Sequence, residues 1–221
     1  MNGPSSTIGS NTWEGLLLSA RVLLEGLPSE LGAPARWTMG GGTVLMLRYG
    51  HRASRDVDLF LRDPQLLACL SPRVNEAAAT LCQDYVEASH FLKLSIGSGE
   101  IDFIVAPDLT GLAPEVMRLA GADTRTDPSL EIIAKKCFYR AAALKVRDVL
   151  DWAVVLEHDP RAGEVLGPIL ATKKRALNER VEALAADFVS RARLELALFE
   201  PGERALDTAV ARVARHLERM L

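Results

Sequence analysis

The spacing of apolar and polar residues differs between the two halves of the chain. Residues 12–31 carry apolar side chains at helical spacing, which predicts an opening helix that Pro28 loosens near its end. Short apolar runs then predict strands and intervening helices. The predicted strands are 36–39, 56–61, 85–88, 91–96 and 101–106, and the predicted helices are 43–49 and 63–83, the latter broken near Ser71.

The second half of the chain has a helical texture. From Pro128 to Leu221 no segment predicts a strand, and Ala, Leu, Arg and Glu dominate, as is typical of a bundle of helices. The sheet-forming half is predicted to end near Pro107. We therefore expect an α+β protein in which a mixed sheet with flanking helices (domain 1–110) precedes a helical domain (111–221).

Composition narrows the class of protein. The 221 residues are 48% hydrophobic and 25% charged, which is typical of a globular protein with a real core. The net charge of −3 provides no overall attraction to nucleic acid, so any RNA contact would need a local basic surface. The polar first residues and the lack of a long apolar run predict neither a secretory signal nor a membrane span. Three cysteines without metal-ligand spacing indicate reduced thiols, so we expect a cytoplasmic protein.

Three aspartates lie within the predicted strands. Asp56 and Asp58 share one face of their strand because side chains alternate, and Asp102 lies between Ile101 and Phe103 on a later strand. An exposed strand face with solvated carboxylates is the commoner situation, but Asp is disfavoured in strands. Carboxylates that converge repel one another unless a divalent cation neutralises them, and Mg²⁺ prefers such oxygen ligands. The pattern predicts metal-dependent phosphoryl chemistry.

A glycine-rich turn precedes these aspartates. Gly41 and Gly42 would let a phosphate approach the backbone amides, and Thr43 adds a hydroxyl at a predicted helix start. Taken alone, such a run is more often a flexible turn. Residues 43–55 leave room for one short helix and a return to the sheet before Asp56, so the turn and the carboxylates are predicted to meet at one edge.

Taken together, these motifs resemble the DNA-polymerase-β-like nucleotidyltransferases, which combine a Gly-Gly turn, an Asp-x-Asp pair and a third acid on a later strand. Within that superfamily, the residues between the turn and Asp56, among them Arg52 and Ser54, are most similar to the AbiEii/MenT group of nucleotidyltransferase toxins. That group also has a basic and acidic block in its helical part. Here the block is represented by Lys136, Arg140, Asp148 and Asp151. The resemblance covers roughly residues 36–152.

The resemblance implies a role for each of these residues. Mg²⁺ would be held by Asp56, Asp58 and Asp102, and the last of these would also help to accept a proton. Phosphates would lie on the glycine turn, and the helical domain would complete the nucleotide site. The predicted nucleotide-binding residues are Gly41, Gly42, Thr43, Arg52, Ser54, Arg140, Asp148 and Asp151, with Lys136 as a catalytic residue that offsets charge on the leaving pyrophosphate.

The second block also permits other interpretations. Lys136 and Arg140 lie four residues apart and share a helix face, as they would in an ordinary solvated helix with charge pairs. Asp148 and Asp151 would either orient Lys136 or Arg52, or contact the nucleotide. His51 is expected to be a solvated surface histidine with no catalytic role. The aromatic residues are expected in the core, because no stripe alternates them with basic residues.

The implied function is a Mg²⁺-dependent nucleotidyltransferase that moves a nucleoside monophosphate from an NTP to an acceptor hydroxyl. The resemblance implies the toxin of a toxin–antitoxin or phage-defence system, with a cognate antitoxin as partner and tRNA as the first acceptor to consider. Two alternatives stay open, namely a nucleotidyltransferase for small molecules such as aminoglycosides and a non-catalytic nucleotide-binding module. A basic cluster at Lys173–Arg175, with further arginines after it, permits an RNA acceptor, although interspersed glutamates would pair with it.

Overall fold

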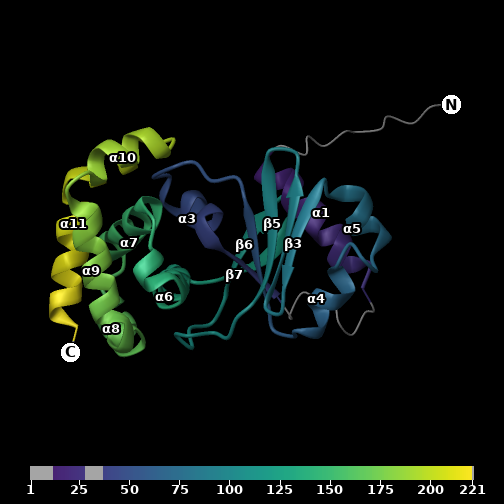
Figure 1. Ribbon diagram of the computed structural model, residues 1–221, viewed down its shortest axis with the longest axis horizontal. Helices are drawn as coiled ribbons and strands as arrows, with labels where there is room; N and C mark the ends of the chain where they lie inside the picture. Colours follow the sequence, from purple (N-terminus) through teal and green to yellow (C-terminus); the bar gives the residue numbers. More distant parts are fainter. Residues whose placement is uncertain (1–11, 28–36, 221) are drawn as a thin grey trace. The chain divides into compact units, whose positions relative to one another are not determined.

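The computed structural model describes residues 12–27 and 37–220, which Figure 1 draws as ribbons. Its contacts divide the chain into two compact units. The sheet unit consists of the described parts of Met1–Thr43 together with Ser54–Pro107 and Pro114–Thr126. The helical unit consists of Val44–Ala53, Asp108–Ala113 and the described part of Asp127–Leu221. Assignment of domains to 1–110 and 111–221 stays a prediction.

The sheet unit contains a mixed seven-stranded sheet in the order β3-β4-β5-β2-β1-β7-β6. Strands β2 and β5 are parallel, as are β1 and β7, whereas the other neighbours are antiparallel. The predicted α+β class with a mixed sheet is therefore confirmed. The strands are β1 (Trp37–Gly40), β2 (Val57–Leu61), β3 (Asp84–Ala88), β4 (Phe91–Ile96), β5 (Gly99–Val105), β6 (Glu115–Leu119) and β7 (Ala122–Thr126).

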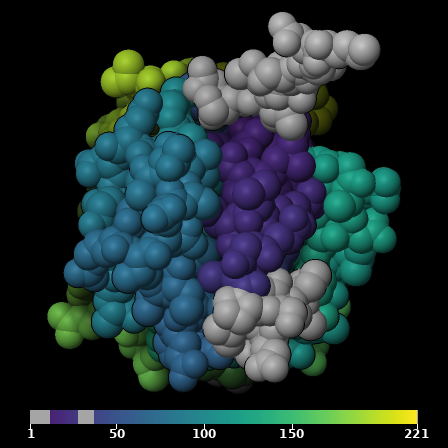
Figure 2. Space-filling model, turned by 90° about the vertical axis from the view of Figure 1, so that its right-hand side faces the viewer, coloured from purple at the N-terminus to yellow at the C-terminus, as the bar shows by residue number. Residues whose placement is uncertain are grey.

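Of the helices that the structure describes, three lie wholly in the same unit, namely α1 (Trp13–Glu25), α4 (Gln65–Leu70) and α5 (Glu76–Leu81). Helix α1 begins after Thr12, whose hydroxyl accepts a hydrogen bond from the Gly15 amide, and it contacts β2, β5 and α5. Figure 2 shows α1 in purple on one face of the unit, beside the blue segment that includes α5. The helix ends at Glu25, before the predicted end, and the predicted positions 28–31 and 36 lie outside the described residues.

The sheet does not end near Pro107, so that prediction is wrong. Strands β6 and β7 form an antiparallel hairpin, and β7 joins the sheet by pairing in parallel with β1 through Thr126 and Met39. Ala120 and Gly121 form the turn, both with positive φ angles of 45° and 81°, as in the tight turns that suit hairpins. The strands were missed because they carry mostly polar or exposed side chains, so they lack an apolar run.

The helical unit confirms the prediction for the second half of the chain, because no strand occurs within residues 128–220. Its helices are the later part of α3 (Gly41–Tyr49), then α6 (Ser129–Arg140), η2 (Ala141–Ala143), α7 (Val146–His158), α8 (Ala162–Leu170), η3 (Ala171–Lys173), α9 (Lys174–Ala185), α10 (Phe188–Glu195) and α11 (Glu200–Arg219). Helix α11 packs closely on α7, with a buried stripe that includes Leu206, Val213 and Leu217. No helix among the described residues is long and apolar enough to cross a membrane.

Candidate active site

The central carboxylates of the sheet unit lie on the neighbouring parallel strands β2 and β5. Their register places Asp58 directly beside Asp102. Side chains alternate along both strands, and the neighbours Val57, Leu59 and Ile101 are buried in the core while the two aspartates are only partly buried. Both carboxylates therefore emerge on the same face of the sheet, as the alternation in the sequence predicted.

The glycine turn lies against the Asp58 carboxylate. Gly40 at the end of β1 pairs with Asp58, and Gly41 follows with a φ angle of +72°. A Cβ atom at Gly41 would lie 1.8 Å from Asp58 Oδ2, so no larger residue fits without displacing that carboxylate. Glycine is thus required here both by backbone conformation and by space. Binding of phosphate by Gly41 and Gly42 stays a prediction.

Asp56, Thr43 and Ser54 form a set of contacts at the entrance to β2. Asp56 Oδ1 accepts a hydrogen bond from the Glu100 amide at 3.2 Å, which connects Asp56 to the beginning of β5. The Thr43 hydroxyl donates to the Asp56 carbonyl and lies 3.1 Å from the Ser54 hydroxyl. Thr43 is fully buried, so these contacts give it a structural role. The predicted phosphate contacts of Thr43 and Ser54 stay predictions.

Asp102 has an unusual electrostatic environment. Burial, followed by the charge of Asp58, raises the pKa of Asp102 to about 6, although Lys93 acts in the opposite direction. Lys93 lies on β4 in register with Asp102, and its Nζ donates to Asp102 Oδ2 at 3.2 Å and also to Glu100. Burial alone would lower the pKa of Lys93, but the bond with Glu100 and the charge of Asp102 raise it. Sequence reasoning missed Lys93 because cross-strand register is not a local pattern.

The donor set suits a hard cation. Asp102 Oδ1 is buried and accepts no hydrogen bond among the described residues, although Lys93 Nζ lies 3.2 Å from it. An unsatisfied carboxylate oxygen beside a second carboxylate is an arrangement that a divalent cation would stabilise. Within residues 12–27 and 37–220, no three acidic, histidine or cysteine side chains are already arranged as a metal site. Metal binding by Asp56, Asp58 and Asp102 therefore stays a prediction.

The predicted acidic pair of the helical unit is surrounded by cations. Asp151 is fully buried and accepts hydrogen bonds from Lys136 Nζ at 2.6 Å and from Arg52, whose Nε and second terminal nitrogen bind its two oxygens at 2.7 and 2.8 Å. Burial alone would raise the pKa of Asp151, but Arg52 and Lys136 hold it well below its usual range. The structure thus places Asp151 against both basic residues that it was considered to orient.

Asp148 connects the same lysine to Arg140. Its Oδ1 lies 3.1 Å from Lys136 Nζ and 2.6 Å from Arg140, and its Oδ2 accepts from the Lys145 amide at 3.0 Å. Burial opposes ionisation, but the charges of Lys136 and Arg140 lower the pKa of Asp148. The block predicted from the sequence is therefore one connected network of ion pairs. A contact of its residues with a nucleotide stays a prediction.

His51 is not a solvated surface residue, so that expectation is wrong. Its side chain is fully buried, and Nε2 lies 2.7 Å from Asp151 Oδ1. The Phe199 amide donates to the His51 carbonyl at 3.1 Å, and a Cβ atom at Gly202 would lie 1.9 Å from that carbonyl oxygen. The C-terminal helices therefore hold the segment that presents His51 and Arg52 to Asp151. Only the position of His51 beside Arg52 signalled this role in the sequence.

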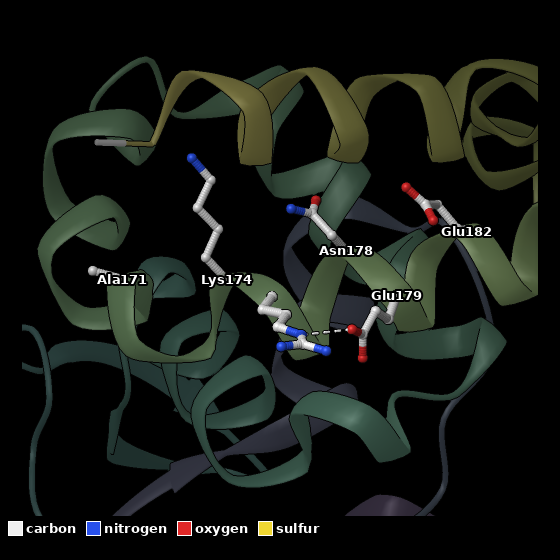
Figure 3. Close-up of a pocket in the computed structure, with 6 residues that line it drawn as sticks. Ala171, Lys174, Asn178, Glu179 and Glu182 are labelled. Atoms are coloured by element: carbon white, nitrogen blue, oxygen red, sulfur yellow. Dashed lines mark hydrogen bonds and ion pairs between the residues drawn. The ribbon is translucent and has the colours of Figure 1, made fainter.

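The later basic cluster is largely paired. Arg175 contacts Glu179 at 2.8 Å, and Lys174 donates to the Met220 carbonyl. Lys174, Arg175 and Glu179 are among the residues that line a pocket of about 450 Å³ along α9, and Figure 3 draws its lining side chains with a dashed line at Glu179. Not every aromatic residue lies in the core, contrary to expectation. Trp37 and Trp152 are buried, whereas Tyr139 is 53% exposed.

Comparisons with known proteins identify the family. The family model described as nucleotidyl transferase AbiEii toxin of a type IV toxin–antitoxin system matches residues 22–217. Among solved structures, the chain is similar to MenT4, a nucleotidyltransferase toxin from Mycobacterium tuberculosis H37Rv. The two chains are 15% identical with a TM-score of 0.49, over 96% of this chain and 85% of that one. The comparison with curated proteins found no match. Because the family model spans most of its length, the protein belongs to the AbiEii family of nucleotidyltransferase toxins and is a nucleotidyltransferase.

Proposed function

We propose that this toxin transfers a nucleoside monophosphate from an NTP to a hydroxyl of tRNA, in a Mg²⁺-dependent reaction that releases pyrophosphate. The observation that supports the proposal most strongly is the pairing of Asp58 with Asp102 on adjacent strands, beside a glycine turn that admits no side chain. In the protein without a bound cation, the two adjacent carboxylates repel each other, as the raised pKa of Asp102 indicates. A site that binds a cation and a phosphate chain explains why the cost is tolerated.

The residues of the sheet unit fit a division of tasks. Asp56, Asp58 and Asp102 would hold Mg²⁺, and Asp56 is already positioned by the Glu100 amide. Mg²⁺ bound there would offset the charge of the phosphates and lower the pKa of the attacking hydroxyl. Asp102 is the best candidate to accept the proton of that hydroxyl, because its pKa is raised towards neutrality, to about 6. Gly41 and Gly42 would leave their amides open to phosphate oxygens.

In the helical unit, Lys136 and Arg140 are proposed to offset phosphate charge, with Asp148 and Asp151 holding them in place. The ion pairs of Asp148 with both cations support this order of roles. Arg140 keeps a side chain that is 37% exposed, whereas Lys136 is almost buried, so Arg140 is the more accessible to a ligand. Arg52 is more deeply buried and paired with Asp151, which favours a positioning role.

A toxin of this family implies an NTP as substrate and a cognate antitoxin as partner. We propose the cytoplasm as its place of action, because both NTPs and tRNA are found there. A small-molecule acceptor is the second candidate. It is supported only by the net charge of −3, which gives no general attraction to nucleic acid.

The direct test is incubation of the purified protein with Mg²⁺, each α-labelled NTP in turn, and total bacterial tRNA. Label is then followed in RNA, protein and small-molecule fractions. The matched pair of variants is Asp58→Asn and Asp123→Asn, both in the sheet unit, because Asp123 is 73% exposed and pairs only loosely with Arg118 at 3.4 Å. The proposal predicts label in tRNA with the wild type and Asp123→Asn, and none with Asp58→Asn.

Other outcomes would redirect the proposal. Label only in small molecules would support the second acceptor candidate. Label in tRNA that persists in Asp58→Asn would contradict the assignment of the active site. Full transfer after complete chelation of divalent cations would contradict the dependence on metal.

A further inference from the structure

We propose that Lys93 is an exchangeable counter-ion of Asp102, which moves fully onto Glu100 when a divalent cation binds, so that Lys93 and Glu100 set the cation affinity of the site. This inference rests on the proposed cation site and extends it to two residues that take no part in the reaction. Both would act as positioning residues. All the groups concerned lie in the sheet unit.

The geometry places the ammonium group between two carboxylates. Lys93 and Asp102 are register partners across β4 and β5, and Ser95 pairs with Glu100 two positions along the same ladder. Residues 93 and 95 point to the same side of β4, as do 100 and 102 on β5, so the Lys93 side chain can reach both acids on one face. Its Nζ contacts Glu100 and lies 3.2 Å from each oxygen of Asp102.

The two contacts of Lys93 are not equivalent. Glu100 is the more exposed acid, with 38% of its side chain accessible against 19% for Asp102. Lys93 Nζ donates to Glu100 and to Asp102 Oδ2, whereas Asp102 Oδ1 accepts no hydrogen bond among the described residues. Lys93 is therefore anchored on Glu100 and only partly satisfies Asp102, which leaves Asp102 available to a stronger cation.

Removal of the cation would restore the ammonium to Asp102. In the protein without a cation, Lys93 offsets part of the repulsion that Asp102 receives from Asp58. The ammonium therefore competes with the metal, and Glu100 weakens this competitor by offering it another partner. Lys93 competes with the cation for Asp102, and Glu100 reduces that competition. Substitutions of Lys93 and Glu100 should therefore change the cation affinity in opposite directions.

The experiment is a titration of the full-length protein with Mn²⁺ alone, followed by electron paramagnetic resonance of the free ion, so that no turnover is needed. Lys93→Met is expected to bind Mn²⁺ about tenfold more tightly, because a competing charge has been removed. Glu100→Gln is expected to bind it several-fold more weakly. Lys93→Arg, which keeps the charge, should stay close to the wild type.

The double variant separates exchange from a simple sum of charges. If Glu100 acts by holding Lys93, Glu100→Gln changes little in the Lys93→Met background, and Lys93→Met/Glu100→Gln binds as tightly as Lys93→Met. Two additive effects would overturn the exchange, as would Lys93→Met binding that is unchanged or weaker. Arg118→Met and Asp123→Asn break an exposed ion pair of the same unit and provide the charge-matched control.

The inference and the proposed function fail in distinguishable ways. Mn²⁺ binding that follows this pattern in a protein that transfers no label would sustain the inference and remove the proposed reaction. Mn²⁺ binding that is absent, or unaffected by Asp58→Asn, would overturn the inference even if label were transferred.

Discussion

The sheet unit and the helical unit each contain a pair of partly or fully buried aspartates in contact with basic side chains, but the two pairs have opposite electrostatics. In the sheet unit, burial and Asp58 raise the pKa of Asp102 to about 6. In the helical unit, Arg52 and Lys136 overcome the burial of Asp151 and hold its pKa well below the usual range. Asp102 therefore has too little positive charge around it to favour its ionised form, whereas Asp151 has enough.

This difference indicates what each cluster is built to do. Asp151 is held by three basic residues, His51, Arg52 and Lys136, so it gains little from a ligand and serves to fix their positions. Asp102 has an oxygen without a hydrogen-bond partner among the described residues and would gain from a cation. Charge that neighbouring cations do not neutralise therefore distinguishes the candidate binding site more clearly than the number of acidic residues does.

The largest effect on stability is expected for Asp151 in the helical unit. Asp151→Asn removes the buried negative charge that Arg52 and Lys136 share, although Lys136 still contacts Asp148 at 3.1 Å. Breaking a buried ion pair in this way costs about 3–5 kcal/mol. Chemical denaturation at pH 7.5 would measure the loss. A loss below about 1 kcal/mol would show that the network is weakly coupled to folding.

The stability of the protein should change in the opposite direction when Asp102 in the sheet unit is substituted. The pKa of Asp102 is raised from 3.8 to about 6 by folding, so its ionisation opposes folding at neutral pH. Asp102→Asn should therefore stabilise the metal-free protein at pH 7.5 by up to about 3 kcal/mol, since each pKa unit corresponds to about 1.4 kcal/mol.

The pH dependence of this gain provides its own check. Well below pH 3.8 the carboxyl group is protonated in both the folded and the unfolded state, so the advantage of Asp102→Asn should vanish there. The advantage should grow as the pH rises from about 4 to about 6 and level off above that. Denaturation curves for both proteins at pH 4, 6 and 7.5 would test this. A gain that is independent of pH would point to packing rather than charge.

The smallest effect is expected for an exposed ion pair in the helical unit. Arg175 is 91% exposed and contacts Glu179 at i,i+4 spacing on α9. Arg175→Met should change the free energy of unfolding by less than about 0.5 kcal/mol, because exposed pairs of this kind contribute little. A larger change in chemical denaturation would mean that the pocket along α9 has a structural role that its contacts do not suggest.

Much of the site follows from local patterns in the sequence. The alternation around Asp58 and Asp102 predicts strands with both carboxylates on one side, and the structure confirms their adjacency. The helical second half was also recognisable from its composition. By contrast, the β6–β7 hairpin joins the sheet with exposed polar strands, which carry little periodic signal.

The missed residues depend on contacts between distant parts of the chain. The His51 segment is held by a backbone hydrogen bond from Phe199, and Lys93 reaches Asp102 only through the register of β4 and β5. Neither contact can be predicted from the few residues that surround His51 or Lys93 in the sequence. Tyr139 was expected in the core because no stripe alternates aromatic with basic residues, but it lies on the exposed side of α6.

The most direct test of the contrast between the two clusters is label transfer from an NTP by Asp58→Asn, measured beside its unfolding free energy. The variant should stay folded and lose transfer by a factor on the order of 10³, the loss of several kcal/mol expected when a metal site is disabled. A folded Asp58→Asn protein that transfers label at close to the wild-type rate would contradict the assignment of the active site to the sheet unit.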